Sequence, residues 1–263
     1  SHYEGRLRLP WPCGALLASS RFRAVFSRDQ LTADDLSSQL QRPVLFVGNP
    51  FMDTVLTPVH PLPSVARRIG LLPGSRRPEL EANLRLLLEL VRLLPPSPEL
   101  TLDLALVNSL DDDTLEQLAH SSGWCLQRGR LHCGGALCIN VRRDLFQAVL
   151  QQSDLVIGMA GTAIEQAVGL AKPALQVPGH GPQFTAAFAE AQRRLLGPTV
   201  FCAPGSSGSP TNLQASAELA VSLLNRSQTD TTLQRQCRDE AARRLGSRGG
   251  GSRMAEAISA LLP

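Results

Sequence analysis

Two glycine-containing turns carry side chains that suit phosphate binding. In the first, an apolar run ends at Leu72, and Pro73, Gly74, Ser75 and Arg76 lead into a helical pattern. Backbone N–H groups at a helix start point toward an anion, and the helix dipole favours negative charge there. Ser75 adds a hydroxyl donor, and Arg76, or Arg77 beside it, adds a guanidinium that can hold a phosphate with two parallel hydrogen bonds. The turn predicts a phosphate site, with a plain strand-to-helix turn and solvated arginines as the alternative.

The second turn follows a buried apolar run at residues 155–159. Gly158 and Gly161 have the spacing Gly-x-x-Gly, which is not the fingerprint of a dinucleotide site. Thr162 and Glu165 have the spacing of a capping box, in which each side chain satisfies an N–H group at the helix start. The functional alternative places the N–H groups of Gly161 and Thr162 on a phosphate and lets Glu165 accept hydrogen bonds from a ribose. Both interpretations stay open at this point.

A third loop, residues 178–185, has four Gly or Pro positions around His180 and Gln183. The amide of Gln183 both donates and accepts hydrogen bonds, as the recognition of sugar hydroxyls requires. For His180 the alternative is a histidine that is only exposed. Two loops suited to phosphate and one suited to hydroxyls, if they belong to one sheet, together predict a nucleotide-sugar ligand.

The elements around these loops alternate between strand and helix throughout residues 67–203, which predicts a doubly wound parallel α/β sheet. In such sheets, ligands bind in the crevice outside the carboxyl ends of the strands. The predicted strands are 68–72, 100–107, 136–140, 155–159, 173–177 and 199–202, and the predicted helices between them are 78–94, 111–120, 145–152, a helix from Thr162, and 184–196. Pro78 is expected at the first helical position, with Glu81 and Arg85 paired on the outer face of that helix.

The ends of the chain are less regular. Residues 1–20 are predicted as loop, residues 23–26 and 44–47 as short strands, and residues 29–40 as a helix with Thr32 as a cap. The proline-rich stretch after Phe51 predicts a linker. Helices are predicted at 212–225 and 229–245, and a last helix at 254–262 follows the glycine-rich break at 246–251.

Composition excludes several classes of protein. The 263 residues suffice for one large or two modest domains, and no apolar run approaches the roughly 20 residues that span a bilayer. One Tyr and no basic stripe with interleaved aromatics argue against nucleic-acid binding. Six cysteines without a Cys-x-x-Cys pair predict no metal site and a reducing, cytoplasmic compartment. The start lacks an initiator Met and a signal pattern, so we expect the chain to begin within a longer protein.

The basic residues are almost all Arg, and Lys172 is the only Lys. Arg is the residue that recognises planar anions with two hydrogen bonds. Codon bias of the source genome is the alternative explanation for this composition.

Taken together, Gly-Ser-Arg at 74–76, Gly-Thr-x-x-Glu at 161–165 and Pro-Gly-x-Gly-Pro-Gln-Phe at 178–184 resemble the donor domain of two-domain GT-B glycosyltransferases. The resemblance is greatest to lipid-A-disaccharide synthases and the proteins related to them, and residues 47–53 are similar to that family's crossover between domains. It implies two facing Rossmann-like domains. Residues 1–50 would be the incomplete end of the N-terminal acceptor domain, 51–66 the linker, 67–250 the donor domain and 251–263 a C-terminal helix.

By the same resemblance, Ser75 and Arg76 would bind the diphosphate, Thr162 a phosphate, Glu165 the ribose and Gln183 the sugar. Uracil would be held by backbone before the helix at 145, near Arg143. The implied enzyme is an inverting hexosyltransferase that needs no metal or other cofactor and moves a sugar from a donor such as UDP-N-acetylglucosamine to a lipid or sugar acceptor.

The general base would lie in the missing part of the acceptor domain, so we expect this fragment alone to be inactive. A cytoplasmic protein with peripheral contact to the inner membrane fits the resemblance. The alternatives are a UDP-N-acetylglucosamine 2-epimerase-like enzyme and a non-catalytic nucleotide-sugar binding module.

Overall fold

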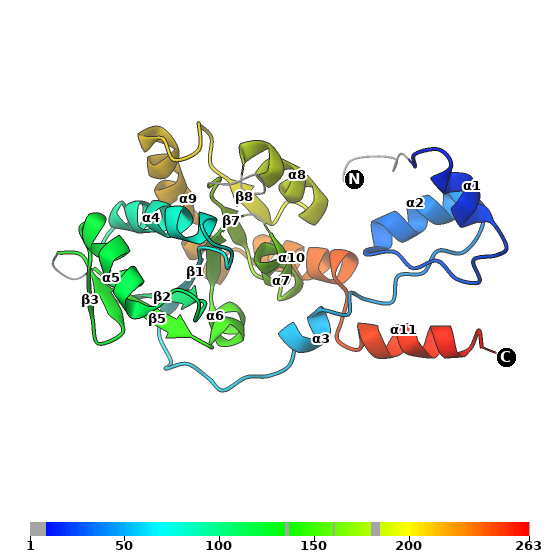
Figure 1. Ribbon diagram of the computed structural model, residues 1–263, viewed down its shortest axis with the longest axis horizontal. Helices are drawn as coiled ribbons and strands as arrows, with labels where there is room; N and C mark the ends of the chain where they lie inside the picture. The colour runs from blue at the N-terminus through cyan, green and yellow to red at the C-terminus, as the bar shows by residue number, and fades with distance from the viewer. Residues whose placement is uncertain (1–8, 135–136, 160, 180–184, 263) are drawn as a thin grey trace.

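The computed structural model describes residues 9–134, 137–159, 161–179 and 185–262. Within them, one eight-stranded sheet with the order β3-β4-β5-β2-β1-β6-β7-β8 forms the centre of the molecule (Figure 1). The run from β5 to β8 is parallel, and β3 and β4 add an antiparallel hairpin at one edge. The doubly wound α/β fold predicted from the sequence is confirmed. The strands are β1 Arg67–Leu72, β2 Leu100–Leu106, β3 Cys125–Gln127, β4 Arg130–His132, β5 Cys138–Arg143, β6 Leu155–Gly158, β7 Ala174–Gln176 and β8 Val200–Cys202.

The strand order contains a topological switch at β1. The chain builds β2 and β5 on one side of β1, then crosses to place β6, β7 and β8 on its other side. At such a switch point the loops at the carboxyl ends diverge to opposite faces and leave a crevice. The crevice expected here lies between the ends of β1 and β6.

Helices cover both faces of the sheet (Figure 1). One core cluster joins α4 (Glu79–Arg92), α5 (Asp112–Ser121) and α9 (Pro210–Thr229) to one face. A second cluster joins α3 (Met52–Val55), α6 (Phe146–Gln152) and α7 (Thr162–Gly169) to the other. The predicted inner face of α4 is buried along its whole length. Glu81, however, pairs with Arg77 at 2.5 Å, on the turn before it, instead of with Arg85.

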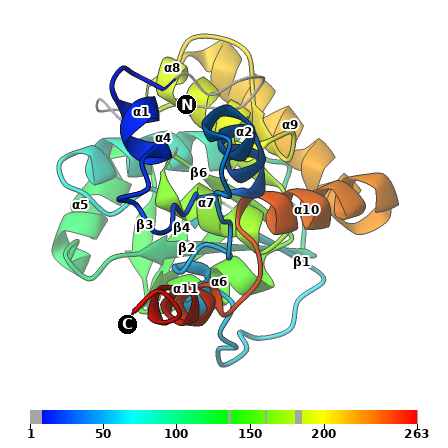
Figure 2. The same ribbon diagram turned by 90° about the vertical axis from the view of Figure 1, so that its right-hand side faces the viewer.

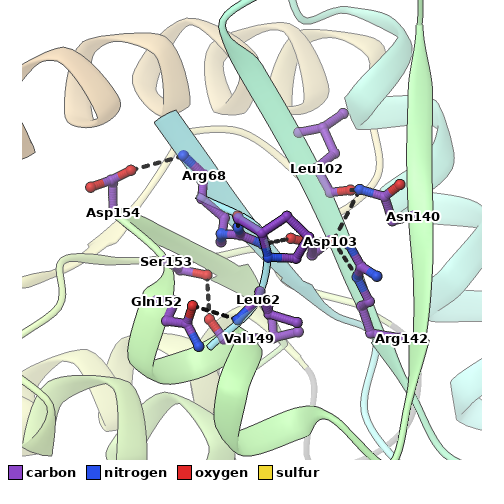
Figure 3. A network of polar contacts seen from close by, with 11 residues as sticks. Leu62, Arg68, Leu102, Asp103, Asn140, Arg142, Val149, Gln152, Ser153 and Asp154 are labelled. Carbon is purple, nitrogen blue, oxygen red and sulfur yellow. Dashed lines mark hydrogen bonds and ion pairs between the residues drawn. The ribbon is translucent and has the colours of Figure 1, made fainter. Parts of the chain in front are cut away.

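A buried ion network ties the linker to this second face (Figure 3). Asp103, in the middle of β2, is fully buried and pairs with Arg68 of β1 and, at 2.6 Å, with Arg142 of β5. Arg68 also donates to the carbonyl of Pro63 at 2.5 Å, and Asn140 donates to Asp103 at 3.1 Å. Because an unpaired carboxylate is costly inside a protein, these contacts fix the strands and the linker together.

The amino-terminal segment forms a small unit with its own core of Val25, Ala33, Leu36, Leu40 and Val44. Residues predicted as loop contain α1 (Cys13–Ala18). The two predicted strands reduce to one parallel bridge, Phe26 with Leu45, since among the described residues each segment has only the other to pair with. Helix α2 (Gln30–Leu40) is capped by Asp29, whose Oδ1 accepts from the Thr32 N–H at 2.7 Å, so the prediction of Thr32 as the cap was wrong.

The carboxyl-terminal segment returns to this small unit. After α8 (Ala186–Leu196), α9 and α10 (Thr231–Arg244), the last helix α11 (Gly250–Ser259) begins inside the predicted glycine break. The carboxylate of Asp53 accepts hydrogen bonds from the N–H groups of Gly249, Gly250 and Gly251 and so starts the helix four residues early. Figures 1 and 2 place α1, α2 and α11 at the end of the molecule opposite β3. The predicted domain boundaries remain predictions.

Candidate functional site

The two predicted phosphate turns are neighbours in space. They follow β1 and β6, which pair in parallel with Leu72 opposite Gly158, and the Met159 N–H extends the ladder to the Leu72 carbonyl at 3.3 Å. A Cβ atom on Gly158 would meet the Leu72 side chain and carbonyl at 2.9 Å, so only glycine allows this close approach. The end of the sheet at the switch point therefore has Gly74–Arg76 on the β1 side and Gly161–Glu165 on the β6 side.

The first turn is open. Gly74 has φ 98°, a left-handed conformation that favours glycine, and it turns the chain away from the sheet. Ser75 and Arg76 are exposed beyond it. Pro78 is the N-cap and α4 begins at Glu79, one residue later than predicted. Arg77 pairs with Glu81 at 2.5 Å, and Arg76 is the arginine that the resemblance implies for the diphosphate.

The second turn differs from both interpretations of its sequence. Gly161, with φ 147°, is the N-cap, and Thr162 is the first helical residue. The predicted capping box is wrong, because its Ser/Thr member must itself be the N-cap. The Gly161 N–H, predicted to face a phosphate, donates to Oε1 of Gln192 at 2.6 Å in this structure.

Gln192 of α8 is the residue that holds this turn, and sequence reasoning missed it. Its Nε2 donates to the Gly161 carbonyl at 2.8 Å, and its Oε1 also accepts from Nε2 of Gln176 at 2.6 Å. Gln192 is 6 % exposed and Gln176, in β7, is fully buried. A glutamine inside an apolar strand requires a polar partner, and this was the signal available in the sequence.

Glu165 lies in the first turn of α7 and faces the amino-terminal unit. Its Oε1 is 3.3 Å from the guanidinium of Arg28, with side-chain exposures of 19 % and 38 %. Arg28 follows the bridge at Phe26 and is joined to Asp29 at 3.7 Å. The small unit thus contacts the start of α7 and engages the carboxylate predicted to bind a ribose.

Arg143 lies farther along the same sheet edge, at the end of β5. It donates to the Val107 carbonyl at 3.0 Å and pairs with Asp112 at 2.7 Å, so its side chain ties β5 to the loop before α5. The loop after it, Asp144–Leu145, borders a cavity of about 610 Å³ that the linker residues Pro58–Pro61 close from the other side. Parallel strands are about 4.8 Å apart, so β5 is roughly 10 Å from β1 across β2.

The third loop begins at this edge too, because β7 pairs with β6. A Cβ on Gly179 would lie 2.2 Å from Oδ1 of Asn83 in α4 and 3.0 Å from Sδ of Met159, so the loop starts beside α4 and the end of β6. His180 and Gln183 lie outside the described residues. Their predicted contacts with a sugar remain predictions.

Two further findings concern metal ligands and membrane-spanning helices. Among the residues that the structure describes, no three His, Cys, Asp or Glu side chains are grouped as metal ligands would be. None of the helices in that part of the chain is both long enough and apolar enough to cross a bilayer.

Comparison with known proteins agrees with this geometry. No family model matches the chain. A lipid-A-disaccharide synthase of Trichlorobacter lovleyi is 33 % identical over 129 residues, which cover 46 % of this chain and 30 % of that protein. The chain thus matches less than a third of the curated relative's length. The match agrees with the predicted resemblance to this family.

Solved structures show the fold more completely. A Listeria monocytogenes protein assigned as a UDP-N-acetylglucosamine 2-epimerase has a TM-score of 0.57 and 18 % identity, covering 95 % of this chain and 63 % of that one. The Neisseria meningitidis 2-epimerase, solved with UDP-N-acetylglucosamine, has a TM-score of 0.53 and 14 % identity over 95 % of this chain and 65 % of its own. The kitacinnamycin glycosyltransferase has a TM-score of 0.50 and 19 % identity over 88 % and 51 %. The chain has a GT-B Rossmann-like fold.

Proposed function

We propose that this chain is the donor-binding half of a glycosyltransferase that uses a UDP-sugar of the UDP-N-acetylglucosamine type. The observation that carries the proposal is the adjacency of the turns after β1 and β6 at the switch point, with Ser75 and Arg76 on one and Thr162 and Glu165 on the other. The sequence and structural relatives support it, because glycosyltransferases and a protein solved with a UDP-sugar share this fold.

The diphosphate is assigned to the open turn. Ser75 and Arg76 are exposed residues beside the start of α4, whose dipole favours an anion. When the bond to the sugar breaks, negative charge grows on the departing UDP, and these same groups stabilise it. The exposed hydroxyl of Thr162, across the crevice, is assigned to a second phosphate oxygen.

The ribose is assigned to Glu165 and the uracil to the loop at Asp144–Leu145. A carboxylate has about four acceptor positions, so Glu165 can accept from ribose hydroxyls once Arg28 releases or shares it. The cavity beside the 144–145 loop, at about 610 Å³, has room for a pyrimidine ring between prolines and α6. We assign Gln183 to the sugar hydroxyls.

The acceptor and the base that deprotonates it are assigned to parts outside this chain, which covers 63 % of the Listeria monocytogenes structure. We propose a lipid or sugar acceptor, inversion at the transferred carbon, and a cytoplasmic protein with peripheral membrane contact.

Isothermal titration calorimetry with UDP and UDP-N-acetylglucosamine tests the donor site. Arg76→Ala is expected to weaken binding roughly 10- to 100-fold, because a charge-assisted hydrogen bond contributes about 1.5–3 kcal/mol. Arg77→Ala is the matched control, since the neighbouring guanidinium is held by Glu81 and should leave affinity unchanged. Folded protein that binds neither ligand, or equal losses in both variants, would refute the proposal.

An epimerase-like activity is the second candidate, because the 2-epimerase structures cover 95 % of this chain. Incubation of the whole protein with UDP-N-acetylglucosamine alone separates the two. An epimerase inverts C2 of the sugar without an acceptor, whereas a transferase returns the substrate unchanged until an acceptor is added. Binding of UDP without either reaction would identify a non-catalytic binding module.

A further inference from the structure

A second cavity, of about 290 Å³, lies at the opposite edge of the sheet from the crevice. Asp154, immediately before β6, and Lys172, two residues before β7, line it from the sheet side. Gln234, Cys237 and Arg238 line it from α10. Because the predicted phosphate turns follow the carboxyl ends of β1 and β6, this cavity is separated from them by the length of the strands.

The charges around this cavity are unbalanced. Among the ion pairs of the described residues, none includes Lys172 or Arg238. Asp154 is the acidic residue in the lining, and its Oδ2 accepts the backbone N–H of Arg68 at 2.8 Å. Two cations against one carboxylate leave a net charge of +1.

Burial makes this imbalance costly at Lys172, whereas Arg238 is exposed. Lys172 is partly buried, and desolvation lowers the pKa of its ammonium, while Asp154 acts in the other direction. Burial raises the pKa of the Cys237 thiol to about 11, so the thiol is neutral at pH 7 and supplies no counter-charge. A cation removed from water without a partner is destabilised, and an anion in the cavity would remove that cost.

We propose that this cavity binds a small oxyanion between the ammonium of Lys172 and the guanidinium of Arg238. A water molecule occupies about 30 Å³ of liquid, so the cavity has room for several waters or for one phosphate or short carboxylate. The Lys172 ammonium acts as a compact charge, and the Arg238 guanidinium holds two oxygens of the anion. The site is independent of the nucleotide site and does not require the proposed transferase activity.

The single lysine gives a direct readout. In protein labelled with [13C]lysine, one side-chain Cε resonance reports Lys172. Titration with inorganic phosphate at constant ionic strength is expected to shift this resonance saturably and to raise the pKa of the ammonium toward its ordinary value. Thermal unfolding should move to higher temperature along the same binding curve, since a ligand that binds only the folded state stabilises it. Sodium chloride at matched ionic strength should do neither.

Variants test the assignment of the two cations. Lys172→Met is expected to abolish the thermal shift, and Arg238→Gln to weaken binding about tenfold or more. Arg235→Gln, which changes an exposed residue of the same helix outside the cavity, should bind as the parent does. A parallel titration with succinate separates a carboxylate site from a phosphate site. The proposal fails if neither anion gives a saturable response, or if Lys172→Met responds like the parent.

Discussion

The turns after β1 and β6 are neighbours at one sheet edge, but their polar groups are engaged differently. Ser75 and Arg76 on the first turn are exposed. On the second turn, Gln192 takes both the N–H and the carbonyl of Gly161, and Arg28 takes the carboxylate of Glu165. The first turn thus presents these two residues at the surface. The second has a fixed backbone and one carboxylate that must be released, so its contribution depends on two distant parts of the chain.

The largest expected effect comes from removing the hydrogen bonds that Gln192 makes with the second turn. Gln192→Leu keeps the size of the side chain but leaves the Gly161 N–H, the Gly161 carbonyl and Gln176 Nε2 without their partner. Each unpaired buried group costs about 1–3 kcal/mol, so we expect the free energy of unfolding to fall by roughly 2–4 kcal/mol after partial relaxation. Urea denaturation measures it, and UDP affinity should fall as well.

Two further variants sharpen that test. Gln236→Leu makes the same substitution at an exposed position on α10 and should leave the free energy of unfolding within about 0.5 kcal/mol of the parent. Gln192→Glu keeps an acceptor for the Gly161 N–H and for Gln176, but it loses the donor to the Gly161 carbonyl and buries a carboxylate, so a loss of stability is expected here too. Equal stability of the parent and Gln192→Leu would show that the hydrogen bonds of Gln192 contribute nothing to the free energy of unfolding.

A smaller effect, on the affinity for UDP, is expected from removing the ion pair between Arg28 and Glu165. If Arg28 competes with a ribose for this carboxylate, Arg28→Gln should raise the affinity for UDP, and by no more than about fivefold, because exposed ion pairs contribute at most about 1 kcal/mol. Raising the salt concentration should reduce the difference between variant and parent. A lower affinity in Arg28→Gln would instead mean that Arg28 itself binds the nucleotide.

The smallest effect is expected at the start of α11. There a carboxylate of the chain itself occupies the position that an anion is proposed to take at the start of α4. At the start of α11 the carboxylate of Asp53 accepts three backbone hydrogen bonds, and these lower its pKa below the ordinary 3.8. Because the folded-state pKa is depressed, the contribution of Asp53 is present above its unfolded pKa and is lost as the pH falls through the folded value.

Unfolding measured between pH 2 and 6 should therefore lose stability less steeply below about pH 4 in Asp53→Asn than in the parent. Glu256→Gln, at an exposed position on the same helix, is the control and should follow the parent's pH dependence. Identical pH profiles for Asp53→Asn and the parent would show that the carboxylate at this helix start is not stabilised by its three N–H donors.

Local patterns in the sequence determined most of the secondary structure and the positions of the turns. Apolar runs bounded by glycine or proline identified the parallel strands β1, β2, β6 and β7, because a strand buried on both faces is mostly apolar. The predicted boundaries were wrong where a residue distant in the sequence determines the start of a helix. Asp53 starts α11 early from nearly 200 residues away, and the capping box failed because Gly161, held by Gln192, takes the cap position instead of Thr162.

The tertiary structure decided which residues come together at the candidate site. The sequence placed Ser75, Arg76, Thr162 and Glu165 at the ends of strands, but only the strand order puts β1 beside β6 and so brings the two turns together. The contacts of Gln192 with Gly161 and of Arg28 with Glu165 join residues 31 and 137 positions apart. Hydrophobic periodicity and turn chemistry act over a few residues, whereas these contacts depend on how whole elements pack.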